Sequence, residues 1–126
     1  MPRIECFEDV DAWRAARELA RQVYTATASR SFARDPALRD QMRRAAVSAM
    51  ANIAEGFERG SDPEFRRFPA IAKGSVGEVR SQLYVALDAG HITPEEFTRL
   101  SDLASETSRL IGGFMKYLTG SMAGRG

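Results

Sequence analysis

The sequence predicts an all-α fold, an antiparallel up-down-up-down four-helix bundle. Three observations predict it. Four stretches repeat apolar residues at spacings of three and four, which is the period of a helix, and no stretch has the pattern of a strand. Helix start and stop signals bound these stretches. Their connections are short, so sequence neighbours should pack antiparallel. With 126 residues, we expect one domain over residues 1–119 and a disordered tail over 120–126.

The first two helices are expected at about residues 9–29 and 36–55. The apolar face of the first comprises Trp13, Ala16, Ala20 and Val23, with Thr27 extending the row. In the second, Asp35 is a good N-cap, Pro36 suits the first helical position and Gly56 can end the helix. Its apolar face comprises Leu38, Met42, Ala45, Ala49 and Ile53.

The third and fourth helices are expected at about residues 63–89 and from Pro94 to Leu118. Asp62 should cap the third, and Gly90 should end it. Pro69 lies inside its apolar pattern, which predicts either a kink or a late start of the helix. Before the fourth helix, Thr93 and Glu96 form a capping box, and Ile92 and Phe97 have the spacing of a hydrophobic staple.

Composition excludes several classes of protein. The net charge of +1 is too small for a dedicated, strongly basic DNA-binding domain, although it allows a local basic patch. No apolar run is long enough to cross a membrane, and residues 1–5 lack the apolar core of a signal peptide. Cys6 is the single cysteine, so no internal disulfide can form. We therefore expect a cytoplasmic protein without a membrane partner.

Residues that carry out chemistry are scarce. His91 is the only histidine and follows Gly90, so we expect it in a loop, in solvent. One histidine and one cysteine provide neither the ligand pattern of a metal site nor a recognisable nucleophile pair. No glycine-rich nucleotide-binding motif is present. For Gly74 and Gly77 we favour close helix packing over a phosphate-binding loop. The sequence thus predicts no enzyme activity, no metal and no cofactor.

Polar side chains form a row on each of two helices. On the second helix the row comprises Arg44, Ser48, Asn52 and Glu55, and on the third it comprises Ser75, Glu78 and Gln82. Small residues adjoin the first row, so the two helices can approach closely. We predict that the rows face each other as a partly buried polar network or line a subunit interface, rather than forming a solvated surface.

Several motifs identify a family resemblance. They are QMRRAAVS at 41–48, NIAEG at 52–56, FRRF at 65–68 and IAKGS at 71–75, with Glu78, preceded by FEDV at 7–10, Trp13 and Ala16. Together they resemble the four-helix bundle family of bacterial 23S ribosomal-RNA intervening-sequence proteins, from Phe7 to Leu118. The chain departs from the family pattern at Pro69 and at residues 33–37, and neither departure bears directly on function.

The resemblance implies properties that residue spacing does not show. Members are bacterial and assemble as ring-like homopentamers. Some are encoded within ribosomal RNA genes, and relatives act as accessory proteins of diversity-generating retroelements, where they partner a reverse transcriptase and bind nucleic acid. Other members have no assigned role. The resemblance therefore implies a homo-oligomer with RNA, DNA or a reverse transcriptase as its partner.

Two functions remain open from the sequence. The first is nucleic-acid binding through arginine-rich helix faces, with the candidate residues Arg14, Arg17, Arg21, Arg39, Arg43, Arg66, Lys73 and Arg80. Acidic neighbours dilute these faces, and charged helix faces are commonly just solvated. The alternative is a protein-interaction scaffold with no nucleic-acid ligand. It is indicated by a second apolar row on the fourth helix, made of Leu103, Leu110 and Tyr117.

Overall fold

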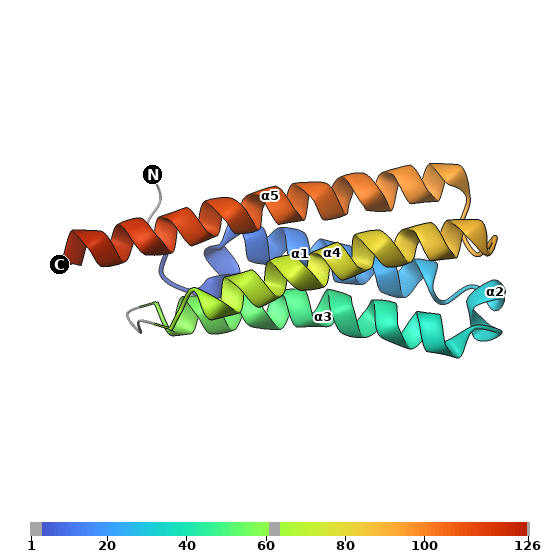
Figure 1. The fold of residues 1–126 in the computed structure, drawn as a ribbon, viewed down its shortest axis with the longest axis horizontal. Coiled ribbons are helices and arrows are strands. Elements are labelled where there is room, and N and C mark those ends of the chain that lie inside the picture. The colour runs from blue at the N-terminus through green and yellow to red at the C-terminus, as the bar shows by residue number, and fades with distance from the viewer. Residues whose placement is uncertain (1–3, 61–63, 126) are drawn as a thin grey trace.

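The computed structural model describes residues 4–60 and 64–125, with 121–125 as backbone only. Within these ranges the elements are η1 (Phe7–Asp9), α1 (Asp11–Ala26), α2 (Arg30–Ala33), α3 (Pro36–Glu58), α4 (Arg67–Asp88) and α5 (Pro94–Arg125). The long helices α1, α3, α4 and α5 run side by side in alternating directions (Figure 1). The predicted all-α, up-down-up-down bundle is confirmed.

Each long helix packs against two others. The extensive contacts join α1 to α3, α3 to α4, α4 to α5 and α5 back to α1. The remaining pairs, α1 with α4 and α3 with α5, lie diagonally across the core from each other. The side chains there include Leu19, Met42, Ile53, Val76, Val79, Leu83, Leu100 and Ile111, all fully buried. Burying a side chain of this size contributes roughly 1.5–3 kcal/mol, so the apolar rows determine the arrangement of the helices.

Helix α3 continues past the end that the sequence predicted. Gly56 does not stop the helix, which runs to Glu58. Instead, Gly56 is buried against α4, and a Cβ atom at this position would lie 2.9 Å from Cδ of Pro69. The glycine therefore permits α3 and α4 to approach closely. The sequence pattern indicated a helix end at Gly56 and could not reveal this role.

Pro69 produces a late helix start rather than a kink. Helix α4 begins at Arg67, so Pro69 occupies its third position. The first four N–H groups of a helix have no partner within the helix, so the missing N–H of proline causes no loss there. The predicted cap Asp62 and the predicted start at residue 63 lie outside the described residues. At the other end, Gly90 adopts a positive φ of 78°, which confirms it as the terminator.

Helix α5 begins at the predicted capping box. The backbone N–H of Glu96 donates to Thr93 Oγ1, and the N–H of Thr93 donates to Glu96 Oε1, both at 3.1 Å. The helix is traced to Arg125, beyond the point at which we expected the ordered chain to end. Disorder of the tail 120–126 stays a prediction.

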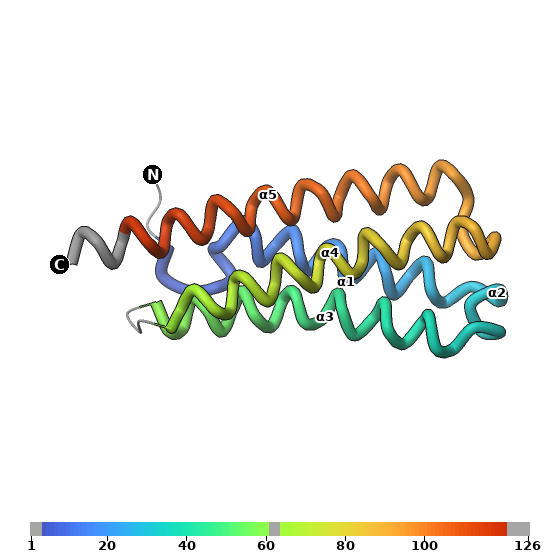
Figure 2. The backbone as a smooth tube through the Cα atoms, viewed as in Figure 1, coloured from blue at the N-terminus to red at the C-terminus, as the bar shows by residue number. Residues whose placement is uncertain are grey.

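The short helix α2 was not predicted. It occupies the connection between α1 and α3 and places the ring of Phe32 in the core, fully buried. Figure 2 shows that α2 lies at the same end of the bundle as the connection between α4 and α5. We call this the α2 end. It brings together polar residues far apart in the sequence.

Candidate functional site

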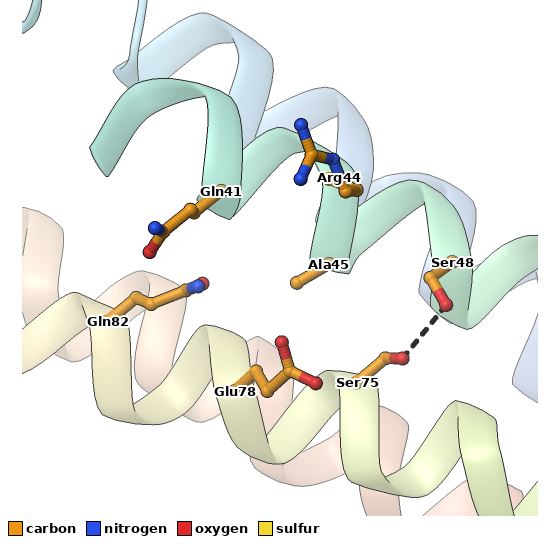
Figure 3. Close-up of a pocket in the computed structure, with 7 residues that line it drawn as sticks. All are labelled: Gln41, Arg44, Ala45, Ser48, Ser75, Glu78 and Gln82. Carbon is orange, nitrogen blue, oxygen red and sulfur yellow. Dashed lines mark hydrogen bonds between the residues drawn. The ribbon is translucent and has the colours of Figure 1, made fainter. Parts of the chain in front are cut away.

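A polar groove lies on the surface between α3 and α4, with a cavity volume of about 250 Å³. Figure 3 shows its residues on the two facing helices. They are Gln41, Arg44, Ala45 and Ser48 from α3 and Ser75, Glu78 and Gln82 from α4. The polar rows that the sequence placed on these helices thus lie opposite each other, and we call this the α3–α4 groove.

One end of the groove is closed by hydrogen bonds. The hydroxyls of Ser48 and Ser75 are 3.0 Å apart across the two helices. Asn52 adds to this contact, because its Nδ2 donates to the carbonyl oxygen of Ser48 at 2.9 Å and to its Oγ at 3.1 Å. Glu55, the last member of the predicted row, instead pairs with Arg59 at 2.8 Å. The Ser48–Ser75 bond joins the two helices, and Asn52 supports it from within α3, without using Arg44 or Glu78.

The rest of the groove carries polar groups that are not paired. Arg44 and Glu78 are exposed on opposite helices, and no ion pair involving either is found within the described part of the chain. The Oε1 atom of Gln82 is buried and has no hydrogen-bond partner among the described residues. A buried acceptor without a donor destabilises a fold by about 1–3 kcal/mol. The groove therefore holds both a donor and acceptors for a ligand.

The outer side of α4 beside the groove carries two glycines, which have no side chains. Gly74 and Gly77 are exposed, and a Cβ atom built on either would meet no described residue within 4 Å. Our prediction of close helix packing at these glycines is therefore wrong within the bundle. Glycine in a helix interior is destabilising by about 1 kcal/mol relative to alanine, and no close contact at these two positions with the described residues compensates for it.

The arginine row of α1 is largely committed to acidic neighbours. Arg21 pairs with Glu18 at 2.5 Å, and Arg14 lies 3.8 Å from both Asp9 and Asp11. Hydrogen bonds from Arg21, and then from Gln22, lower the pKa of Glu18 to about 2. Arg17 lies over the ring of Trp13, with 5.8 Å from its Cζ to the ring centroid. The residues Arg14, Arg17, Glu18 and Arg21 line a surface depression of about 320 Å³.

The arginine row of α3 is also engaged. Arg39 pairs with Asp40 at 3.0 Å. Arg43 donates from Nε to Thr27 Oγ1 at 2.8 Å and lies over the ring of Tyr24. Thr27, which we placed at the weak end of the apolar face of α1, is buried and connects the two helices through this bond.

The basic row of α4 differs from the other two. Arg66 lies over the ring of Phe65, but Lys73 and Arg80 have no ion pair among the described residues. Both are exposed, and helical spacing puts them on the same face of α4 as Tyr84, which contacts Phe97 of α5. The edge-to-face contact of Tyr84 with Phe97 fixes the antiparallel register of these helices. We call Lys73 and Arg80 the α4 basic flank.

The position of His91 differs from the one that we expected from the sequence. His91 is not in solvent, since only 10% of its side chain is exposed. Its Nδ1 lies 2.5 Å from Ser31 Oγ and its Nε2 lies 3.0 Å from Asp35 Oδ2. A carboxylate only accepts, so Nε2–H donates to Asp35, and Nδ1 forms the second hydrogen bond with the Ser31 hydroxyl. The ring also packs against Phe32, with centroids 4.6 Å apart. The unpredicted helix α2 supplies two of these contacts.

Asp35 makes a further contact in the same cluster. Its Oδ1 accepts from the N–H of Leu38 at 3.3 Å, as predicted for the N-cap of α3. His91, Ser31 and Asp35 thus connect the α4–α5 connection, α2 and the start of α3. The contacts account for the hydrogen-bonding groups of the imidazole ring, which indicates a structural role.

An apolar depression of about 210 Å³ lies between the start of α1 and the later part of α5. It includes Leu110 and Tyr117, two members of the second apolar row of α5. Leu103 and Leu110 pack partly buried against the core, while Tyr117 is 43% exposed. Two of the three residues in the second row therefore pack against the core, and Tyr117 is the member of the row that remains exposed.

Two further findings concern the described residues only. No group of three or more histidine, cysteine or acidic side chains is positioned there to hold a metal ion. The helices in this part of the chain are also too polar or too short to cross a membrane.

The comparison with protein families gives a match over most of the chain. The family model described as 23S rRNA-intervening sequence protein matches residues 8–113. No curated protein matches the sequence closely enough to count as a relative. The matched range includes α1, α2, α3, α4 and most of η1 and α5, and apart from Phe7 it contains the motifs on which the resemblance was based. The chain belongs to the 23S rRNA-intervening sequence protein family.

Proposed function

We propose that this protein is a non-catalytic, homo-oligomeric helical bundle that binds nucleic acid through the α4 basic flank. The observation that supports this most is the unpaired state of Lys73 and Arg80 within the described residues, beside the paired arginines of α1. A cation already held by a carboxylate must lose that partner before it binds a phosphate. Lys73 and Arg80 are free of this penalty.

The spacing of the α4 basic flank suits a phosphate backbone. Seven residues along a helix correspond to about 10 Å, so Lys73 and Arg80 can contact separate phosphates. The register set by Tyr84 and Phe97 places Ser101 and Ser108 of α5 level with these cations. Serine hydroxyls are common donors to phosphate oxygens.

A single chain offers few such contacts, so assembly is part of the proposal. The net charge of +1 provides little general attraction to nucleic acid. A homo-oligomer, which we propose to be a pentamer, would repeat the α4 basic flank around a ring. Linked weak sites bind with an avidity far above that of each site alone.

The experiment is a fluorescence-anisotropy titration of labelled single-stranded RNA at several salt concentrations. The test variant is Lys73→Gln with Arg80→Gln, and the matched control is Arg14→Gln with Arg21→Gln. For single strands, each lost phosphate contact reduces the slope of log K against log salt by about 0.7. We expect the test variant to lose affinity and about 1.4 of slope for each subunit that contacts the strand, while the control retains most of both. Equal losses in the two variants would contradict the proposal.

Assembly is tested separately by size-exclusion chromatography with light scattering. We expect a mass that is a multiple of the 13.9 kDa chain, with five copies as the proposed number. A monomer at micromolar concentration would contradict the oligomeric part of the proposal and remove the avidity on which tight binding depends.

A protein-interaction scaffold is the second candidate, favoured by the apolar depression at Tyr117. This candidate predicts that Tyr117→Ser reduces oligomer mass or partner capture and that no RNA or DNA binds at low salt. RNA binding that depends on Lys73 and Arg80 would decide against it.

A further inference from the structure

We propose that the α3–α4 groove binds the Watson–Crick edge of an unpaired guanine base, an inference that rests on the nucleic-acid binding proposed above. The groove presents a guanidinium on one helix and a carboxylate on the other, separated by the small side chain of Ala45 (Figure 3). A ligand between them must offer an acceptor on one side and donors on the other.

Guanine has this pattern in one plane. Its N1–H and N2–H are adjacent donors, and its O6 is an acceptor beside them. The two oxygens of Glu78 can accept both N–H groups, and Arg44 can donate to O6. Arginine contacts to guanine O6 and carboxylate contacts to base N–H groups are the pairings that base geometry favours.

Gln82 supplies a further reason for a ligand with N–H donors. Its buried Oε1 has no donor among the described residues. The amide faces that of Gln41 from the opposite helix (Figure 3). A rotation of the Gln82 side chain toward the groove would let Oε1 accept the second N2–H of the base, which removes the penalty of an unpaired buried oxygen.

The shape of the groove favours a single base. The hydrogen-bonded pair Ser48 and Ser75 closes one end, so an extended chain cannot continue along the groove. The volume of about 250 Å³ lies below the range of about 300–1,000 Å³ that is typical of sites for whole small molecules. A base inserted from outside, with its sugar and phosphate left on the surface, fits these limits.

The surface of α4 gives the sugar–phosphate chain a route to the groove. Lys73 and Arg80 lie on the α5 side of α4, and Glu78 and Gln82 lie on its α3 side. The exposed ridge between them contains Gly74 and Gly77, where no atom of the described part of the chain lies within 4 Å of a Cβ position. A strand can therefore cross α4 closely, with phosphate on the α4 basic flank and the base in the groove.

The other bases match the groove less well. Adenine and cytosine each offer one exocyclic amino group beside acceptor atoms, and uracil offers one N–H between two carbonyl oxygens. In each case one oxygen of Glu78 faces an acceptor or remains unpaired, which disfavours binding. RNA-binding proteins commonly read unpaired bases by such edge contacts.

The experiment compares labelled decamers of uridine that carry one central guanosine, adenosine or cytidine, measured by fluorescence anisotropy. A bidentate base contact is worth about 1–3 kcal/mol, so wild-type protein should bind the guanosine decamer at least about fivefold more tightly. Glu78→Gln replaces one acceptor oxygen with an NH2 donor, so it can no longer accept N1–H and N2–H side by side, and it should abolish this preference. Asp102→Asn on α5 changes charge equally and should retain it. Circular dichroism checks that both variants are folded.

The outcomes separate the two proposals. If wild-type protein binds all decamers equally, and this binding needs Lys73 and Arg80, the guanine site is wrong and the proposed function stands. If no decamer binds at low salt, both are wrong. A guanosine preference that survives Glu78→Gln also overturns the guanine site.

Discussion

The cluster at the α2 end and the α3–α4 groove are built from similar side chains but differ in how their hydrogen bonds are used. At the α2 end, both ring nitrogens of His91 have partners, and Asp35 serves His91 and the N-terminus of α3 together. In the α3–α4 groove, Ser48 and Ser75 are paired, but Arg44, Glu78 and the Oε1 of Gln82 are not paired with described residues. The first arrangement stabilises the fold, and the second leaves binding capacity for a ligand.

The same contrast separates the two basic faces. Arg21 of α1 pairs with Glu18, whereas Lys73 and Arg80 have no ion pair among the residues that the structure describes. Residue type alone therefore does not distinguish a structural polar group from a functional one. A polar group is structural where the fold already supplies its hydrogen-bond or ion-pair partner, and it is available to a ligand where the fold does not.

The largest expected effect is at the α2 end. His91→Ala removes two hydrogen bonds and the contact with Phe32, so we expect a loss of about 2–3 kcal/mol in the free energy of unfolding. Urea denaturation followed by circular dichroism measures it. Asp35→Asn is the comparison. Leu38 N–H and His91 Nε2–H use different carboxylate oxygens, so the single amide oxygen can keep one of these bonds, and the loss should be smaller, about 1 kcal/mol. A loss under about 0.5 kcal/mol for His91→Ala would show that the cluster does not stabilise the fold.

The glycines of α3 and α4 should respond in opposite directions. Gly56→Ala places a Cβ atom 2.9 Å from Pro69, so overpacking should destabilise the protein by about 1–3 kcal/mol. Gly74→Ala and Gly77→Ala add a Cβ atom that meets no neighbour among the described residues, so each should stabilise the protein by about 0.5–1 kcal/mol. Thermal unfolding of the three variants compares them directly. Destabilisation by Gly74→Ala would mean that the ridge is already covered, for example by a second copy of the chain.

The smallest effect concerns the pairing of the α1 arginines. The pKa of Glu18 is lowered to about 2, below its ordinary value of 4.5, by hydrogen bonds from Arg21 and Gln22. The stabilising contribution of this contact is therefore present above pH 4.5 and is lost as the pH falls toward 2. Nuclear magnetic resonance of the Glu18 carboxyl should give a midpoint near 2 that moves toward 4.5 in Arg21→Gln. A wild-type midpoint at 4.5 would remove the contrast between the α1 and α4 basic faces.

Most of the fold could be predicted because the apolar rows and the capping box of Thr93 and Glu96 are local patterns. The polar rows of α3 and α4 could be placed on their helices for the same reason. The role of Gly56 and the burial of His91 could not, since they depend on Pro69 and on α2, which are near only in the folded chain. The signal for α2 was Phe32, a large apolar residue inside a segment interpreted as a connection.

The sequence also could not predict which of the basic residues have ion-pair or hydrogen-bond partners in the fold. Arginines at helical spacing are equally visible on α1 and α4, but their partners depend on side-chain geometry. Arg21 reaches Glu18 on its own helix, and Arg43 reaches Thr27 on another. The structure therefore narrows the candidate set of eight basic residues to a proposal about Lys73 and Arg80.

The most direct test of the contrast between paired and unpaired polar groups is a map of RNA contacts at residue level. Isotope-labelled protein is titrated with the guanosine-containing decamer, and the backbone and side-chain amide signals are followed by nuclear magnetic resonance. We expect the largest shifts at Lys73, Arg80 and the side-chain amides of Gln41 and Gln82, with little change at His91 or Arg21. Shifts concentrated on α1 or the α2 end, with the α3–α4 groove unchanged, would contradict the account.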